Sequence, residues 1–416
     1  MKIKIISIVL VVLCIGLQAQ KDVQSIDSLI EIGRYKKALL QLSLLSESFQ
    51  KNYKIASVYE AIDNHREASF YYKKSLRFKD DYKTKIKLGK SLLKEKKYTQ
   101  VVKLYEEICA KDSENLIAKY TLGKLYLQVN QYSKAKIIFG ELIADDNENA
   151  NYYYQYALSN PQPKKIFKRI DYYLLAHKKD NKHFNAIEKL ARSFTIIKDR
   201  DSALVFIDKG LELRPNHIDL NRLKINSLFR KKKYNQSINL LKHIDSIQPN
   251  EHFTHKMLGR SYFNIEEYDL AEKHFQKASR LDIDDFRSMI YLGDIAMKNK
   301  NPRMAMFYYM SGTTRGKQKR DRAYMGLANV FSEMKKPRNV LKSYESAVEE
   351  NANNYKALFA FAKQSDNYYK DKKIGYNLYK TYLEKFEGKD SITDNFVRLR
   401  LKEIKKEYFL KGEILE

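Results

Sequence analysis

The stretch MLGRSYFNIEEYDLAEKHFQKASRLD, Met257–Asp282, decides the fold of this chain. Its Leu-Gly pair is followed at fixed spacing by two tyrosines, an alanine and a phenylalanine, which are Tyr262, Tyr268, Ala271 and Phe275. The same types recur 136 residues earlier, four steps of 34, at Leu122, Gly123, Tyr126, Tyr132, Ala135 and Phe139. A fixed period of 34 residues is typical of helix-turn-helix repeat arrays.

Seven units of 34 residues follow one another without a gap from Tyr82 to Lys319. Further units fit at 321–354 and, more weakly, at about 20–48, 49–81 and 355–387. This pattern resembles the tetratricopeptide repeat (TPR), and the resemblance covers nearly all of the chain after residue 19. It implies an all-α fold, a TPR α-solenoid of about ten to eleven helix-turn-helix units, with N-terminal units at 20–149 and C-terminal units at 184–387.

Small and aromatic residues hold fixed positions in the repeat. One small residue recurs on the first helix (Gly89, Gly123, Ala191, Gly259, Gly293, Ala328) and another on the second (Ala38, Ala68, Ala135, Ala203, Ala271, Ala305). An aromatic residue recurs further along the second helix (Tyr105, Phe139, Tyr173, Phe275, Tyr309, Tyr344). Small side chains let helix axes approach to roughly 8–10 Å, and we expect the rings to fill the space between successive units.

Two segments depart from this pattern. In the divergent unit 150–183, Pro161 and Pro163 shorten the first helix, and Arg169 replaces the small residue of the second. Either a kink or a division into two subarrays follows; we favour the kink, because Tyr173 and Ala176 keep their packing positions. Residues 390–416 are expected to form a capping helix and tail, with a near capping box at Ser391 and Asp394 and one apolar face, made of Ile392, Phe396, Leu399, Ile404 and Tyr408.

Residues 1–19 have the layout of a signal peptide. Two lysines precede an apolar run, Ile5–Leu17, and Ala19 provides a small residue for cleavage. The run is too short for a comfortable membrane span. We therefore predict export, no transmembrane span after cleavage, and a periplasmic or outer-membrane-associated location if the cell is Gram-negative. The alternatives are retention as an anchor and acylation at Cys14, although a lipobox has a small residue where Leu13 stands.

The remaining composition favours an anionic partner and contains no catalytic motif. Cleavage would remove Lys2 and Lys4 and lower the formal net charge from +27 to +25, and a basic chain attracts anionic partners. The alternative is compositional, since lysine is abundant throughout. Cys109 would remain as the one cysteine, which excludes an intramolecular disulfide. H-E-x-x-H, G-x-S-x-G and paired C-x-x-C are absent, so we predict no enzyme, no cofactor and no metal site.

The stretch KLGKSLL, Lys87–Leu93, contains the Gly-Lys-Ser of a phosphate-binding loop but lacks its other features. A P-loop has a glycine five residues before the Gly-Lys pair and a strand before that. Here Thr84 occupies the glycine position, within a helical repeat. Nucleotide binding is therefore excluded, and Gly89 is interpreted as a packing position.

The TPR resemblance implies that the inner face of the first helices binds a partner. The candidate partner-binding residues on that face are Lys90, Lys124, Arg192, Arg222, Asn226, Lys256 and Arg260. Two pairs, Arg222/Asn226 and Lys256/Arg260, are four residues apart on one helix face, where their donors can converge on a carboxylate or phosphate. Met257 stands where the carboxylate clamp of some TPR proteins has an asparagine, so that clamp is incomplete.

A second basic feature lies in the turns inside the units. Lysine-rich turns occur at 94–97, 230–233, 298–301, 334–337 and 370–373, and a stacked array would align them along one edge. The stretch RGKQKRDR, Arg315–Arg322, adds a cluster that we expect on the opposite, inter-unit side.

The chain is similar to the exported TPR proteins of Bacteroidetes, some of which serve secretion, motility or outer-membrane assembly. That resemblance implies a non-enzymatic scaffold of the cell envelope, which binds a protein or peptide partner, acidic in character, through its concave groove. The alternative is that the basic edge binds an anionic envelope polymer or lipid head group. Nucleic acid is disfavoured by the export signal and by the scattered lysines.

Overall fold

The computed structural model describes residues 25–314 and 319–415. These ranges contain helices α2 to α23, one 3-10 turn (η1) and no strand, and residues 25–31 are also helical. The predicted signal peptide and half of the Arg315–Arg322 cluster, residues 315–318, lie outside the described residues. The predicted all-α repeat fold is confirmed.

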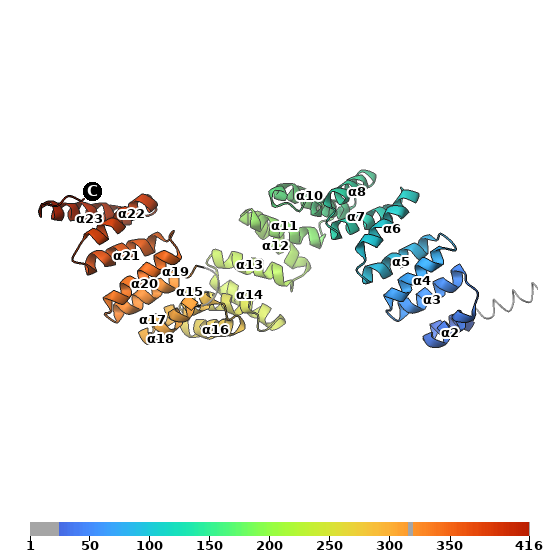
Figure 1. The fold of residues 1–416 in the computed structure, drawn as a ribbon, viewed down its shortest axis with the longest axis horizontal. Helices are drawn as coiled ribbons and strands as arrows, with labels where there is room; N and C mark the ends of the chain where they lie inside the picture. The colour runs from blue at the N-terminus through green and yellow to red at the C-terminus, as the bar shows by residue number, and fades with distance from the viewer. Residues whose placement is uncertain (1–24, 315–318, 416) are drawn as a thin grey trace, which may run out of the picture. The chain divides into compact units, whose positions relative to one another are not determined.

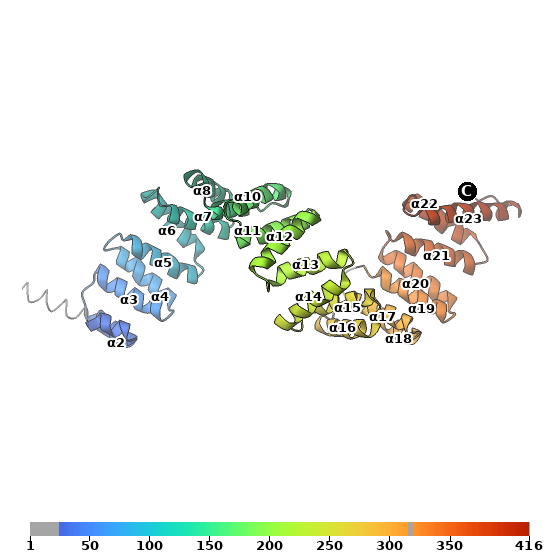
Figure 2. The ribbon, with the colours of Figure 1, turned by 180° about the vertical axis from the view of Figure 1, so that it is seen from behind.

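Contacts along the chain separate it into two compact units, of which the first ends at Leu213 and the second begins at Arg214. In each unit, successive helix pairs are stacked side by side (Figures 1 and 2). The helices of the first unit are α2 (Tyr35–Leu44), α3 (Phe49–Ala61), α4 (His65–Leu76), α5 (Tyr82–Lys94), α6 (Tyr98–Lys111), α7 (Leu116–Gln128), α8 (Tyr132–Asp145), α9 (Ala150–Leu158), η1 (Pro163–Lys165), α10 (Ile166–Lys179), α11 (Phe184–Ile196) and α12 (Arg200–Leu213).

The second unit continues the same alternation. Its helices are α13 (Ile218–Arg230), α14 (Tyr234–Ile247), α15 (His252–Asn264), α16 (Tyr268–Leu281), α17 (Phe286–Lys298), α18 (Pro302–Thr314), α19 (Asp321–Glu333), α20 (Pro337–Glu350), α21 (Tyr355–Tyr368), α22 (Lys373–Phe386) and α23 (Ser391–Phe409). From α3 to α22, each odd-numbered helix is the first of a pair and the even-numbered helix after it is the second.

The helix ends follow the sequence period. Several first helices are preceded by a residue whose side chain accepts a backbone N–H of the first turn, as at Asp81, Asn115 and Asp285. The turn after the first helix contains a non-glycine residue with positive φ, as at Lys232 and Lys300. A left-handed residue just past a helix end satisfies the last carbonyl groups and reverses the chain.

The predicted small and aromatic positions form the buried contacts between helices. Tyr309 on α18 is buried between two successive first helices. A Cβ added at Gly293 on α17 would lie 2.6 Å from its ring, and one at Gly326 on α19 would lie 2.5 Å from it. No side chain fits at such distances, so glycine at both positions lets the ring fill the space between two units, as predicted for this position.

The divergent unit 150–183 keeps its packing but changes its turn. α9 ends at Leu158, and the turn contains Pro161 and Pro163. Arg169, which replaces the small residue, donates to the carbonyl oxygens of Asn160 at 2.8 Å and Gln162 at 2.7 Å. The arginine therefore binds the proline turn instead of filling a packing position. The kink stays a prediction.

Helix α23 packs on the second unit with a different face from the one expected. Val397, Ile404 and Tyr408 are buried, whereas Ile392 and Leu399 are exposed. The prediction was right for Ile404 and Tyr408 and wrong for Ile392 and Leu399, because 392, 396 and 399 lie on one side of a helix of 3.6 residues per turn and 404 and 408 lie on another. The near capping box was also wrong, since Asp390 caps the helix.

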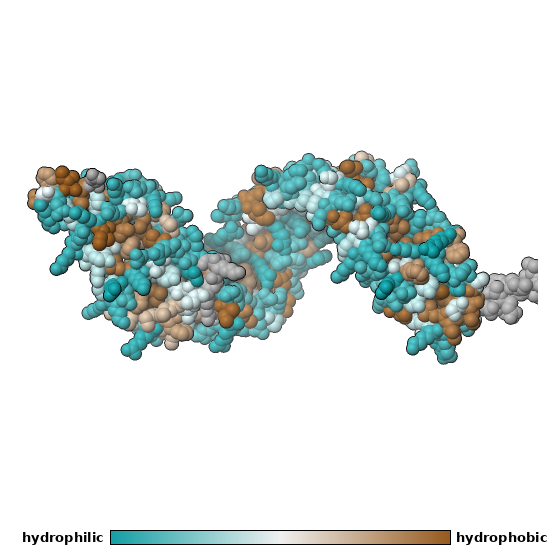
Figure 3. All heavy atoms as spheres, viewed as in Figure 1, coloured by the Kyte–Doolittle hydropathy of each residue, from teal (hydrophilic) through white to brown (hydrophobic). Residues whose placement is uncertain are grey.

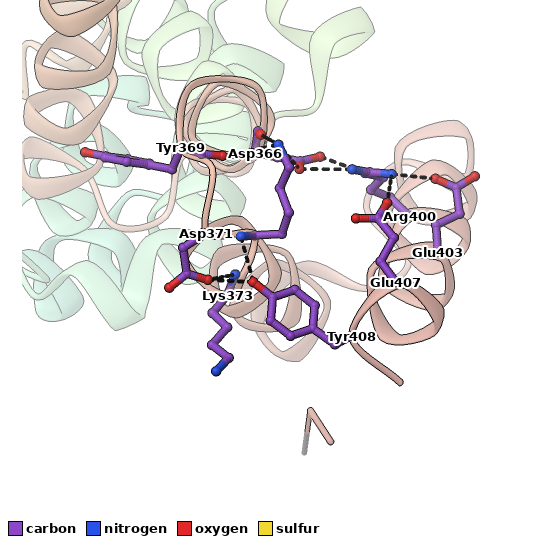
Figure 4. A network of polar contacts seen from close by, with 9 residues as sticks. Asp366, Tyr369, Asp371, Lys373, Arg400, Glu403, Glu407 and Tyr408 are labelled. Atoms are coloured by element: carbon purple, nitrogen blue, oxygen red, sulfur yellow. Dashed lines mark hydrogen bonds and ion pairs between the residues drawn. The ribbon is translucent and has the colours of Figure 1, made fainter. Parts of the chain in front are cut away.

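A polar network fastens this helix to the unit (Figure 4). The buried carboxylate of Asp366 on α21 accepts from Arg400 of α23, at 2.7 Å from Nε and 3.1 Å from the second guanidinium nitrogen. Tyr408 donates to Asp371 at 2.7 Å. A two-pronged arginine–carboxylate contact fixes orientation as well as distance.

Hydrophilic residues cover most of the face seen in Figure 3, and hydrophobic residues appear there in separate patches. The exposed apolar side chains include Phe307 and Met310 on the second helix α18. Single exposed apolar side chains are normal on a folded protein. The face seen in Figure 3 is thus mostly polar. A cluster of charged side chains is therefore the feature that is most informative about a binding site.

Candidate functional site: a cationic pocket on the first helices

The seven predicted partner-binding residues all lie on first helices. Lys90 on α5 and Lys124 on α7 are exposed, and the others are partly exposed on α11, α13 and α15. Two of the seven, Lys256 and Arg260, line a common pocket.

Two of the predicted residues, Arg192 and Arg222, form ion pairs with neighbouring carboxylates. Arg192 donates to Glu188, one helical turn away, at 2.8 Å. Arg222 donates to Glu251 at 3.0 Å and lies over the ring of Phe253. Both arginines are therefore already paired with carboxylates of neighbouring residues, and the convergence of Arg222 with Asn226 on an outside anion stays a prediction.

The pocket lies within the second unit, on the first helices of three successive repeats. It has a volume of about 250 Å³ and is lined by Lys256, Arg260, Phe286, Arg287, Ile290, Tyr291, Lys319 and Arg322. Five of these side chains are cationic and three are apolar or aromatic. Lys256 and Arg260 come from α15, the aromatic and aliphatic residues from α17, and Arg322 from α19.

The aromatic wall is fixed by the core beneath it. Tyr291 stacks on Phe275 with ring centroids 4.7 Å apart, and it meets Phe263 edge-on at 5.2 Å. Phe286 and Ile290 are buried. Aromatic pairs of this geometry add to the stabilisation from burial, so the apolar part of the pocket has a set shape.

A buried carboxylate anchors Lys256. Its Nζ lies 2.6 Å from Oδ1 of Asp285. The other oxygen of that carboxylate, Oδ2, accepts from Ser288 and His252. Burial opposes ionisation of Asp285, but the hydrogen bonds from Lys256, Ser288 and His252 outweigh it and lower the pKa of that carboxyl. The carboxylate stays charged, and Lys256 is held at the pocket edge.

A second carboxylate anchors Arg322. Asp294 on α17 forms an ion pair with Arg322 and accepts from the hydroxyl of Tyr309 at 2.7 Å. The guanidinium also lies 4.9 Å from the ring centroid of Tyr291. Burial raises the pKa of Asp294, and Arg322 and the tyrosine hydroxyl offset only part of that effect.

Two pocket cations have no carboxylate partner in the part of the chain that the structure describes. The guanidinium of Arg260 lies 4.3 Å from the ring centroid of Phe229 and contacts the sulfur of Met257 at 3.4 Å. Lys319 donates to the side-chain oxygen of Asn351 at 3.0 Å. Their positive charge is therefore left for a ligand, next to an apolar wall.

Sequence reasoning found part of this pocket and missed the rest. It identified Lys256 and Arg260, but not Arg287 or Tyr291, which stand just before the Leu-Gly pair of α17. Lys319 and Arg322 were noticed only as the end of a basic cluster on an inter-unit side. The missed signal was that Lys319 and Arg322 stand at the start of the next first helix, α19.

The histidines of α15 have partners within the structure. His252 contacts Asp285, and the Nδ1 atoms of His255 and His274 lie 3.1 Å apart. Residues 25–314 and 319–415 contain no group of three or more His, Cys, Asp or Glu arranged to hold a metal. Across the same ranges, no helix combines the length and apolar character that crossing a membrane requires.

Family models of the tetratricopeptide repeat match residues 52–82, 92–158 and 257–284. No curated protein matches the sequence. Among solved structures, MamA from Desulfovibrio magneticus RS-1 (residues 41 to the end) is 19% identical over 40% of this chain and 94% of its own, with a TM-score of 0.38. Yeast Tom70 is 13% identical, with 93% of this chain and 96% of its own covered and a TM-score of 0.45.

A third solved structure, YrrB, described as a TPR protein with an unusual peptide-binding site, is 15% identical over 47% of this chain and 97% of its own, with a TM-score of 0.40. The family matches fall in both compact units. The 34-residue period joins them along the sequence. The chain is a tetratricopeptide repeat protein.

Proposed function

We propose that this protein is a non-enzymatic scaffold of the bacterial cell envelope, which binds a protein partner through the first-helix face of its second unit. TPR arrays are scaffolds for protein–protein interaction. The observation that carries the proposal is the pocket of about 250 Å³ on α15, α17 and α19, where cations surround an aromatic wall.

The pocket favours binding over catalysis. Its charged side chains are anchored by Asp285, Asp294 and aromatic rings, so little ordering remains when a ligand enters. A catalytic site combines a nucleophile or a general base with a group that orients it, whereas this pocket presents lysine, arginine and aromatic side chains. Such a lining supplies charge and contact area.

Co-purification with crosslinking in native cell envelopes tests the scaffold function. The tagged full chain is compared with a variant that reverses Lys256 and Arg260 to Glu, and with a matched variant that reverses Lys90 and Lys124. We expect the first variant to lose its partner and the second to retain it. Equal recovery by all three proteins contradicts the proposed face.

The envelope location has a separate test, because it rests on residues 1–19. Mass spectrometry of the protein purified from fractionated cells should find Gln20 at the amino terminus and the protein outside the cytoplasm. A retained Met1 in a cytoplasmic fraction contradicts export and leaves the binding proposal untouched.

A second candidate function rests on the turns. Lys232, Lys300 and Lys335 occupy the same left-handed position after the first helices α13, α17 and α19 of the second unit, and all three are exposed. They support an alternative in which this edge binds an anionic polymer or lipid head group. Screening would then make binding fall steeply with salt. Binding to envelope extract that survives about 0.5 M salt contradicts this alternative.

A further inference from the structure

We propose that the pocket on α15, α17 and α19 binds an aspartate or glutamate side chain next to a large apolar side chain, within an internal segment of a partner protein. This inference rests on the proposed function, because it assumes that the first-helix face binds protein. It goes further by assigning the chemistry of the segment and the residues that recognise it.

The charge balance calls for one or two carboxylates. Among the cations that line the pocket, Lys256 is held by Asp285 and Arg322 by Asp294. Arg260 and Lys319 have no carboxylate partner within the described residues. A partner carboxylate placed between these two would complete the charge pairing, with the planar arginine able to donate two parallel hydrogen bonds.

The aromatic wall calls for an apolar group beside that carboxylate. Phe286 and Ile290 are almost fully buried, and Tyr291, held by its stacking on Phe275, keeps part of its surface exposed. A simple polyanion would leave this exposed part of the wall in water, whereas a large apolar side chain would bury it. The lining therefore favours an acidic and apolar peptide over a polymer of charge alone.

The cations are already in position for such a ligand. Arg260 lies over the ring of Phe229 and Arg322 over the ring of Tyr291. A guanidinium stacked on an aromatic ring keeps its edge available for hydrogen bonds. The entropy cost of binding is lower when the receptor side chains are already ordered.

The surroundings favour an internal segment over a chain end. The pocket lies across α15, α17 and α19, and the row of first helices continues in the same unit with α13 and α21. A segment that lies across these helices can therefore continue past the pocket on both sides. The recognised carboxylate is then a side chain, and the terminal carboxylate becomes an alternative for the test to separate.

The first test is selection from a library of random 12-residue peptides displayed between two fixed flanks. The full chain is compared with an Arg260→Met/Lys319→Met variant and with a matched variant of two exposed second-helix lysines, Lys242→Met/Lys342→Met, each checked for unchanged circular dichroism. We expect the chain and the matched variant to enrich an acidic residue adjacent to Phe, Tyr, Leu or Ile. The pocket variant should lose this enrichment.

The second test measures the strongest selected peptide, capped at both ends and fluorescently labelled, by anisotropy. The pocket variant should bind at least ten-fold more weakly and the matched variant within two-fold of the unchanged chain. Replacing the acidic residue by its amide, or the apolar residue by Ser, should each weaken binding by at least five-fold. Inorganic phosphate at about 10 mM should leave more than half of the binding.

Several results overturn the inference. These are no enrichment, equal enrichment by the pocket variant, equal weakening by the matched variant, and binding only by peptides with an uncapped carboxyl terminus. In each case, partner recovery in native envelopes provides the separate test of the scaffold function. If the partner is still lost when Lys256 and Arg260 are reversed, the proposed function stands and only the assigned ligand is wrong.

Discussion

The same repeat positions behave differently on α7 and on α15, which lie 136 residues apart. On α7 they are Tyr120 and Lys124, and Lys124 is exposed, with its Nζ 5.5 Å from the centroid of the Tyr120 ring. On α15 they are Lys256 and Arg260, and both line a pocket with residues from the next two repeats. The repeat fixes the position of a side chain on its helix, and the residues of neighbouring helices determine whether that side chain takes part in a binding site.

The difference comes from the following first helices. Asp285 and Asp294, at the start and in the middle of α17, hold cations that come from α15 and α19. On α5, Lys90 occupies the repeat position of Asp294, is exposed, and makes no ion pair or hydrogen bond with the described residues. A carboxylate at the Asp294 position thus holds a cation from the next first helix.

The largest expected effect in this comparison comes from removing that carboxylate. Asp294→Ala leaves Arg322 and the Tyr309 hydroxyl without their acceptor, so we expect the free energy of unfolding to fall by about 3 kcal/mol. Lys90→Ala, at the same repeat position, should change it by less than about 0.5 kcal/mol. Urea unfolding followed by circular dichroism measures both. Equal losses of unfolding free energy in the two variants would show that the repeat position itself, and not the neighbouring side chains, determines the loss.

Packing under the two regions gives a smaller contrast. Gly293→Ala places a Cβ 2.6 Å from the Tyr309 ring, whereas Gly89→Ala places one 3.1 Å from the Tyr105 ring. We expect the first to destabilise by about 2 kcal/mol through overpacking. In the second, the gain of about 1 kcal/mol from alanine in a helix offsets the closer contact. Thermal unfolding of both variants checks this, and a Gly293→Ala protein as stable as the unchanged chain contradicts it.

The smallest expected contrast is in pH dependence. Burial lowers the pKa of His255 and lowers that of His274 to about 4. The folded region then binds fewer protons than the unfolded chain below about pH 6.5. Stability is full above that pH and falls, by about 1 kcal/mol, as the pH drops toward 4.

Residues 82–145 contain no histidine and provide the internal reference. Hydrogen exchange of α15 and α16 amides, corrected for the intrinsic rate, should speed up between about pH 7.5 and about pH 5 relative to α5 and α7. His274→Gln should reduce that difference. An unchanged difference in the variant would assign the pH effect to other groups.

The sequence predicts the fold well because the period acts on every repeat. Gly293 and Tyr309 could be placed in contact from spacing alone, since the small and aromatic positions serve the same packing in each unit. The pocket could be predicted only in part. Arg260 was found because it follows the Leu-Gly pair, but Lys319 directly precedes α19 and Arg322 lies in its first turn, at positions that the repeat pattern did not single out.

The exposed face of α23 has a similar explanation. Ile392 and Leu399 fit an apolar pattern, yet the contacts that hold the helix are made by Val397 and by the pair of Arg400 with Asp366. A terminal helix has no following repeat to define its buried side. Which face it buries depends on the polar partners that it meets.

Hydrogen–deuterium exchange of the full chain with the strongest selected capped peptide tests the central claim most directly. Amides of α15, α17 and α19 should exchange more slowly when the peptide is bound, and those of α5 and α7 should be unchanged. Protection of α5 and α7, or none on α15, α17 and α19, would contradict the assignment of the partner site to this pocket.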